Sequence, residues 1–307
     1  MTVRKDRLGT SAIVLLLAVS LAIGGQQTAV KFVAEGAPPV LMAALRAGAA
    51  ALCLALWAWA RGIALFRRDG TLKYGLAIGI TGAAQFSLLF VGLEFTTAAR
   101  ATVFLYAAPF IIAAAAHVLV PGERMRRIQF AGMAVAFLGV VAAFSGRVFG
   151  RAEAEGLIGD ALAFAAAFAW AGTILIVRAG PLIRGSAVRT LFYQMVFSLP
   201  CLLLVSLALG ERWSVVPRAH ALLGFAYLVL VVVCFGFVTW VTLLSRYPAA
   251  QIAAYSFLTP VFGVAAGALV LGETLSLDLL AGLALVSVGI YCVSAPSRHK
   301  SRPRTPY

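Results

Sequence analysis

The sequence predicts an all-α polytopic membrane protein with ten transmembrane helices, arranged as two inverted five-helix repeats. Its 307 residues are 62% hydrophobic and only 12% charged, whereas a soluble domain carries roughly 25% charge. The apolar residues form runs long enough to cross a hydrocarbon core of about 30 Å, which takes roughly 20 helical residues. The two halves of the chain also share proline and glycine residues at matched positions.

The charged residues divide the chain into ten apolar segments. The run from Tyr247 to Gly272, for example, contains no charged residue and is long enough to span a bilayer. The ten predicted spans lie near residues 10–30, 39–60, 74–93, 97–119, 128–146, 157–177, 187–209, 219–244, 249–271 and 279–295.

The internal repeat is clearest in residues 98–139 and 249–289. Alanine- and leucine-rich helices can resemble one another by chance, but matched prolines and glycines argue against chance here. A repeat with an odd number of spans inverts its second copy, a recurrent plan of secondary transporters. The matched residues are Pro109 with Pro260, Gly122-Glu123 with Gly272-Glu273, Gly132 with Gly282, and Gly139 with Gly289.

The predicted boundaries follow from this repeat. The first five-helix repeat covers residues 1–148, the second covers 149–297, and residues 298–307 form a basic cytoplasmic tail. Glu123 and Glu273 each precede a predicted helix start, where a carboxylate can accept backbone N–H groups. That structural role competes with a role in transport.

The net charge of +14 is an orientation signal. With the N-terminus in the cytoplasm, 18 of the 25 Lys and Arg residues fall on the inside and 6 on the outside, and Arg46 lies within a span. This bias is the positive-inside pattern of multi-pass proteins, and it places the C-terminus in the cytoplasm as well. We therefore expect contact with a lipid bilayer and no binding of nucleic acid.

Few residues could support a metal site or catalysis. The four cysteines lie singly on different spans, and neither CxxC, HExxH nor GxSxG occurs. The three histidines are His117, His220 and His299. An intramembrane enzyme would need a nucleophile with a base, or clustered metal ligands. We expect no cofactor, no metal and no enzymatic activity.

The doubled Pro…Gly-Glu pattern resembles the EamA branch of the drug/metabolite transporter superfamily. Arg46 early in the second span and the segment at residues 156–171 belong to the same pattern. Within this branch, the chain is most similar to YddG-type exporters of aromatic and other neutral amino acids. The resemblance implies a cavity lined by spans one to four and six to nine, in a multi-pass protein of the bacterial inner membrane.

Polar and aromatic residues within the spans are the candidates for binding a substrate. Aromatic side chains would stack on a flat apolar group, although many such residues in membrane helices serve as packing or interface anchors. Arg46 would attract a carboxylate, or it would be a structural arginine. Amides could bond a zwitterion or stabilise helix contacts. The predicted substrate-binding residues are Arg46, Gln85, Phe86, Phe90, Tyr106, Trp170, Trp240, Gln251, Tyr255 and Phe257.

The favoured hypothesis is a carrier that exports small metabolites, chiefly neutral amino acids, by alternating access. Asp160, Glu94 and His117 are the candidate proton carriers, and each lies near a predicted helix end. Capping of the sixth span explains Asp160, so facilitated or weakly coupled transport is expected. A multidrug or metabolite efflux carrier, a channel and an intramembrane enzyme are the alternatives. A monomer is compatible with the sequence.

Overall fold

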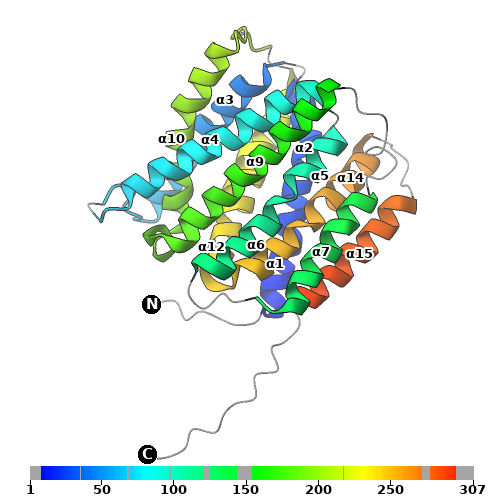
Figure 1. The fold of residues 1–307 in the computed structure, drawn as a ribbon. Helices are drawn as coiled ribbons and strands as arrows, with labels where there is room; N and C mark the ends of the chain where they lie inside the picture. The colour runs from blue at the N-terminus through cyan, green and yellow to red at the C-terminus, as the bar shows by residue number, and fades with distance from the viewer. Residues whose placement is uncertain are drawn as a thin grey trace, which may run out of the picture.

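The computed structural model describes residues 8–34, 36–67, 69–96, 98–120, 125–143, 154–216, 218–271 and 277–294, and these ranges contain helices and no strand (Figure 1). The first half contains α1 (Thr10–Gly24), α2 (Gln26–Ala34), α3 (Pro39–Ala60), α4 (Leu72–Phe95), α5 (Ala98–Leu105), α6 (Ala108–Leu119) and α7 (Arg127–Ala143). The second contains α9 (Ala154–Ala179), η1 (Pro181–Arg184), α10 (Ala187–Ala208), α11 (Ala219–Ala226), η2 (Tyr227–Phe237), α12 (Val238–Arg246), α13 (Ala249–Ser256), α14 (Leu258–Leu271) and α15 (Leu277–Ser294). The predicted Gly-Glu pairs at 122–123 and 272–273 and the basic tail at 298–307 lie outside the described residues.

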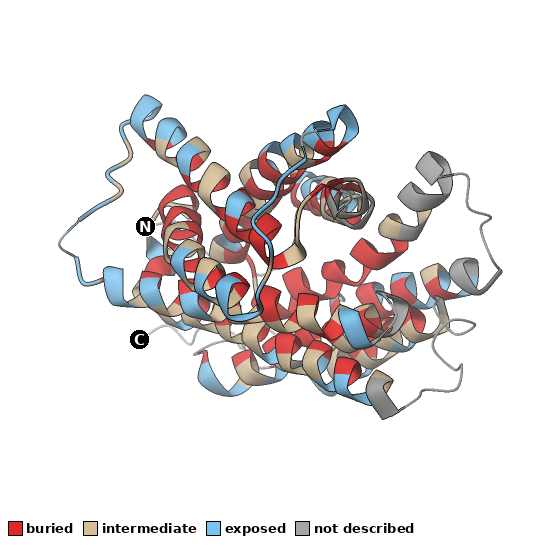
Figure 2. Ribbon diagram, turned by 90° about the horizontal axis from the view of Figure 1, so that it is seen from above, coloured by how far each residue is buried: buried red, intermediate tan, exposed pale blue. Residues whose placement is uncertain are grey.

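The outward surface of the bundle is apolar. Buried residues line the inward faces of the helices and exposed residues the outer faces (Figure 2). Many of the exposed side chains are large and hydrophobic, among them Trp59, Val118, Leu223 and Tyr291. In the described part of the chain, six helical stretches are long and apolar enough to cross a membrane. An apolar surface of this extent indicates contact with lipid.

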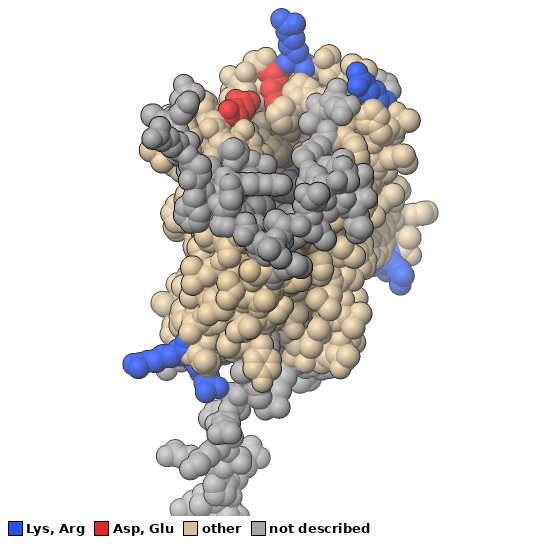
Figure 3. Space-filling view, turned by 90° about the vertical axis from the view of Figure 1, so that its right-hand side faces the viewer, with Lys and Arg blue, Asp and Glu red and all other residues tan. Residues whose placement is uncertain are grey.

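Most charged side chains on the face shown in Figure 3 lie near its upper and lower ends. The surface between them is largely uncharged, as expected where a protein crosses hydrocarbon. α1 begins and α15 ends at the same end of the bundle (Figure 1). The described chain therefore enters and leaves the bundle on one side.

α7 and α15 pack chiefly against each other, at one side of the bundle (Figure 1). A Cβ atom at Gly132 would lie 2.8 Å from the Gly289 carbonyl oxygen, and one at Gly139 would lie 2.7 Å from the Gly282 carbonyl oxygen. The two helices are therefore antiparallel. In the aligned sequence Gly132 corresponds to Gly282 and Gly139 to Gly289. Exchanging the two halves therefore turns the Gly132–Gly289 contact into the Gly139–Gly282 contact.

Three further pairings between the halves show the same exchange. α4 packs on α9, and η2 packs correspondingly on α1. α4 also packs on α10, as η2 does on α3. Likewise α1 packs on α14, and α9 packs on α5 and α6. Each of these pairings between the halves thus has a counterpart in which the halves have changed places.

The predicted spans at 97–119 and 249–271 are not the continuous helices that the sequence suggested. The first breaks between α5 and α6, and the second breaks at Phe257 between α13 and α14. Pro109 is the second residue of α6 and Pro260 the third of α14. Proline has no N–H for the helical ladder, and its ring clashes with the carbonyl four residues earlier. The matched prolines therefore account for a break in each half.

Two further spans are also irregular. The first divides at Gly24 and Gly25 into α1 and α2. A Cβ atom at Gly24 would lie 2.8 Å from the Thr259 carbonyl oxygen, so glycine permits α1 to approach α14 closely. The eighth contains η2, a π-helix over Tyr227–Phe237 between two α-helical segments.

A loop carboxylate joins the two halves at the start of α3. Glu211, in the loop after α10, accepts the backbone N–H groups of Val40 and Leu41 at 2.9 and 2.8 Å, and the Ser206 hydroxyl at 2.6 Å. These N–H groups have no partner within their own helix. Glu211 thus caps α3 from the other half of the chain.

We expect Gly289→Ala to destabilise the protein by roughly 1–3 kcal/mol, the usual range for overpacking a close interface. The new Cβ atom would lie 2.5 Å from the Ala136 backbone nitrogen, and backbone atoms cannot yield without separating α7 from α15. Thermal unfolding in detergent measures the change. Gly172→Ala is the matched control, because its Cβ atom would meet nothing nearer than 3.9 Å. Equal stability of the two variants would contradict the predicted contact.

Candidate functional site

The helix breaks of the two halves meet inside the bundle. Tyr106 occupies the turn between α5 and α6, where it is buried, and its hydroxyl is hydrogen-bonded to the side chain of Thr259 on α14. Phe257, at the other break, packs on Phe110 of α6 with ring centroids 6.3 Å apart. The residue at each break thus contacts the first helical turn that follows the other break.

An aromatic pair lies beside the first break. The ring centroids of Tyr106 and Trp170 are 5.8 Å apart, with the planes at 85°. This edge-to-face geometry is favourable for aromatic rings. Trp170 comes from α9 and is only partly buried. The structure thus brings together two of the predicted residues from opposite halves.

A buried arginine and two phenylalanines form a second group. Arg46 on α3 is 2% exposed, and its Cζ atom lies 4.2 Å from the ring centroid of Phe86 on α4. Phe86 lies 6.1 Å from Phe90, one turn further along α4. A guanidinium over an aromatic face gains a cation–π interaction, worth about 2 kcal/mol or more when desolvated.

Within the described residues, the Arg46 Nε atom has no hydrogen-bond partner. An unpaired buried donor costs about 1–3 kcal/mol, and more for a charged group. Ser87 and Gln26 carry similar atoms, since Ser87 Oγ and Gln26 Oε1 are buried without a partner. These three atoms thus retain unused hydrogen-bonding capacity.

The other predicted residues occupy several positions. Gln85 on α4 is partly buried, whereas Trp240 on α12 and both Gln251 and Tyr255 on α13 are buried. Phe257 is fully buried and packs on Phe110 and Phe137. Phe257 thus belongs to a packed phenylalanine cluster, although it aligns with Tyr106.

The sequence reasoning missed Ser87 and Thr259. Ser87 follows Phe86 directly and Thr259 precedes Pro260. Hydroxyls adjacent to predicted aromatic or proline positions were the available signal. Serine and threonine are so common in membrane helices, where they often bond their own backbone, that this signal is weak.

The candidate proton carriers make other contacts. Asp160 is buried and accepts the Thr96 hydroxyl at 2.8 Å. Because α9 begins at Ala154, Asp160 lies in its second turn, so the predicted capping role is wrong. His117 Nδ1 accepts the Met125 N–H at 2.6 Å, and Glu94 is exposed. The described residues include no group of three metal-ligating side chains.

A model of the EamA-like transporter family matches residues 10–145 and again residues 157–295. The chain belongs to this family. Proteins named "Probable amino-acid metabolite efflux pump" from Salmonella typhimurium (strain LT2) and Escherichia coli (strain K12) are each 32% identical over 229 residues, which are 72% of this chain and 74% of theirs. The "Uncharacterized transporter YvbV" of Bacillus subtilis (strain 168) is 26% identical over 267 residues, 85% of this chain and 84% of that protein.

A solved structure shares the fold. Titled "Crystal structure of protein", it has a TM-score of 0.79 and 23% sequence identity, and the match covers 94% of this chain and 97% of that one. With the apolar helices, membership of the EamA-like family makes this chain a multi-pass membrane transporter rather than an enzyme. The resemblance to the family that the sequence suggested is confirmed.

The bond between the two breaks can be measured with a double-mutant cycle. We expect Tyr106→Phe and Thr259→Val to lose about 0.5–1.5 kcal/mol of shared stability, the usual net value of one hydrogen bond. The double variant should therefore lose less than the sum of the single losses. Unfolding in detergent provides the three differences. Strictly additive losses would show that the two side chains do not interact.

Proposed function

We propose that this EamA-family transporter exports small metabolites, chiefly aromatic and other neutral amino acids, by alternating access across the bacterial inner membrane. The observation that carries the proposal is the meeting of two proline-broken helices at Tyr106 and Thr259. Broken helices at the interface of two repeats commonly form the substrate site of secondary transporters. Irregular backbone is tolerated at that depth only inside protein or beside a cavity.

The proposed architecture has ten crossings in two inverted repeats, residues 1–148 and 149–297. Four of the crossings would each combine consecutive short helices, namely α1 with α2, α5 with α6, α13 with α14, and α11 with η2 and α12. The antiparallel pairing of α7 with α15 and the exchanged helix contacts support this division. So does the double match to the family. The basic residues favour a cytoplasmic N-terminus and C-terminus.

The candidate site fits a zwitterion with a flat apolar side chain. Arg46 supplies a buried positive charge and unpaired donor capacity for a carboxylate. Trp170, Tyr106 and Phe86 supply aromatic surface for the side chain. The names of the Salmonella and Escherichia relatives agree with an amino-acid metabolite.

A multidrug efflux carrier is the second candidate. The aromatic surface would suit a flat cationic drug as well as tryptophan. Buried Arg46 argues against this reading, because it would repel a cation. The sequence also contains only five Met residues, which are the usual means of adapting to unlike ligands.

Counterflow in liposomes tests the proposal. Vesicles containing the purified protein and unlabelled tryptophan are diluted into labelled tryptophan, and the test is repeated with leucine, lysine and a cationic dye. Transient accumulation of labelled tryptophan and leucine is the expected result. Accumulation of the dye alone would establish drug efflux instead, and single-channel currents would contradict a carrier.

Arg46→Gln should weaken the binding of tryptophan by about 10- to 150-fold, which corresponds to loss of a charge-assisted hydrogen bond of about 1.5–3 kcal/mol. Tryptamine has the same ring and no carboxylate, so its affinity should not fall. Arg46→Lys separates loss of charge from loss of the planar guanidinium, and the exposed Arg212→Gln is the control. Unchanged folding and unchanged tryptophan affinity in Arg46→Gln would leave Arg46 a structural residue.

We expect a transmembrane pH gradient to drive little uphill uptake into these vesicles. Proton-coupled carriers usually hold an ionisable relay within the membrane. Here Asp160 is hydrogen-bonded to Thr96, His117 accepts the Met125 N–H near the end of α6, and Glu94 is exposed. Uptake of labelled tryptophan is measured with and without the gradient. Accumulation well above the equilibrium level would disprove weak coupling.

A further inference from the structure

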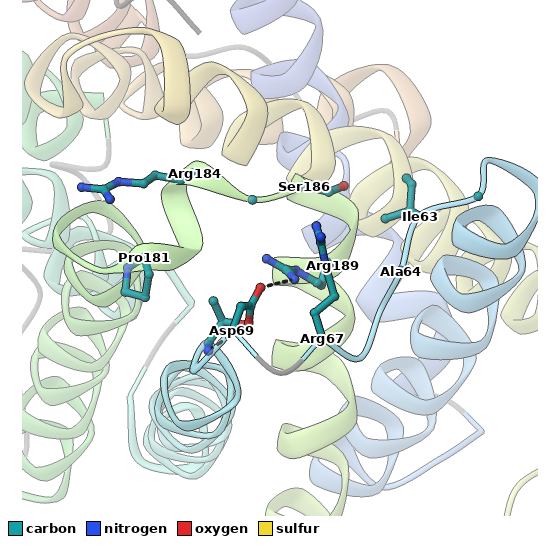
Figure 4. A pocket seen from close by; sticks show the side chains of 11 residues that line it. Ile63, Ala64, Arg67, Asp69, Pro181, Arg184, Ser186 and Arg189 are labelled. Carbon is teal, nitrogen blue, oxygen red and sulfur yellow. Dashed lines mark hydrogen bonds and ion pairs between the residues drawn. The ribbon is translucent and has the colours of Figure 1, made fainter. Parts of the chain in front are cut away.

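A polar cavity of about 740 Å³ lies at one end of the bundle, apart from the candidate transport site. Three segments enclose it, namely the loop between α3 and α4, the short helix η1, and the first residues of α10 (Figure 4). Among the described residues that line it are Arg67, Arg184 and Arg189, and Asp69 is the one carboxylate of that set. These four side chains together carry a formal charge of +2.

The loop that forms one wall is fixed to α10. The Tyr193 hydroxyl donates to the Leu65 carbonyl oxygen at 2.6 Å. Phe66 packs edge to face on Phe192, with centroids 5.7 Å apart, and also contacts the Tyr193 ring. The wall is thus positioned before any ligand arrives, which lowers the ordering cost of binding.

Asp69 orients one arginine at the base of the cavity. Its Oδ2 atom accepts from Arg189 Nη1 at 2.7 Å, while Oδ1 accepts the Thr71 hydroxyl at 2.5 Å and the Thr71 N–H at 3.2 Å. The hydrogen bonds from Thr71 and Arg189 lower the pKa of Asp69 from 3.8 to about 2. The carboxylate therefore stays ionised at physiological pH and holds the Arg189 guanidinium in place.

Arg189 retains donors for a further anion. A guanidinium carries five N–H groups, and the ion pair to Asp69 uses Nη1 alone. Arg189 is 6% exposed. Its charge therefore lies in a largely desolvated position, where its attraction for an anion is stronger than in water. A Cβ atom at Gly185 would lie 2.7 Å from Arg189 Nη2, so glycine provides the space for this group.

Arg67 and the start of α10 offer further donors beside Arg189. Arg67 rises from the loop toward Ser186, whereas Arg184 extends from η1 away from Arg67 and Arg189 (Figure 4). Ser186 is the N-cap residue of α10 and makes no side-chain capping bond, and the first turn of α10 contains no acidic residue. The positive end of the helix dipole is thus uncompensated by a side chain at this wall.

We propose that this cavity is a binding site for a phosphate group, held by Arg67, Arg189 and the start of α10. Donors on several sides suit a tetrahedral anion better than a planar carboxylate, and arginine forks match phosphate oxygens. The positive-inside rule explains arginines in such loops, but not a fixed wall and a carboxylate that orients one of them. The phosphate would belong to a lipid headgroup or to a soluble phosphate ester.

Binding to the delipidated full-length protein in neutral detergent tests this proposal and separates the two sources. The probes are phosphatidylglycerol, presented in mixed micelles, and glycerol 3-phosphate, each titrated at constant ionic strength and followed by thermal unfolding. Arg67→Gln and Arg184→Gln each remove a lining charge without disturbing the Arg189–Asp69 pair. Arg61→Gln removes one charge just after α3, outside the cavity lining, and serves as the matched control.

We expect Arg67→Gln to weaken binding at least about tenfold, the effect of losing one charge-assisted hydrogen bond, and Arg61→Gln to leave it unchanged. Selective binding of phosphatidylglycerol would identify a lipid site, and binding of both probes would identify a site for the phosphate group itself. If Arg61→Gln weakened binding as much as Arg67→Gln, the attraction would be unspecific and the proposal would be overturned. Absence of binding by both probes would overturn it too. Neither outcome depends on transport activity.

Discussion

A bilayer offers no water to backbone N–H and C=O groups, so every interruption of a membrane helix must be enclosed by protein. This structure contains such an interruption in each half, next to Pro109 and Pro260, and encloses both in the same interior region. Tyr106 and Thr259 connect the two breaks directly. The positions of Trp170, and of the cluster formed by Phe257, Phe110 and Phe137, follow from where these breaks lie.

Close approach of helices replaces the hydrophobic effect in this setting, because lipid tails are as apolar as leucine side chains. Glycines provide that approach at α7 with α15, and at α1 with α14. The α7–α15 contact lies at the side of the bundle, with two equivalent glycine pairs. The interior can therefore hold bulky aromatic residues and a buried arginine without losing the contact between the halves.

The helical class and the positions of the apolar helices could be predicted from the sequence, in which matched prolines and glycines mark the repeat. It also allowed Tyr106 and Trp170 to be chosen, and these two do pack together. It did not predict the breaks, because proline is tolerated within membrane helices and its effect depends on the neighbouring helices. Nor could it distinguish Phe257 from Tyr106, since the two occupy matched positions but contact different partners.

The cap that Glu211 provides to α3 joins segments far apart in the chain, and the Asp69–Arg189 ion pair does the same between the α3–α4 loop and α10. In each case the loop that follows the second predicted span of one half is attached to the beginning of the second predicted span of the other half. α3 and α10 are thereby fastened to each other near both ends as well as along their length. The pair of helices α3 and α10, joined in this way, contains residues from both halves of the chain. The boundaries of this structural unit therefore differ from the boundaries of the sequence repeats.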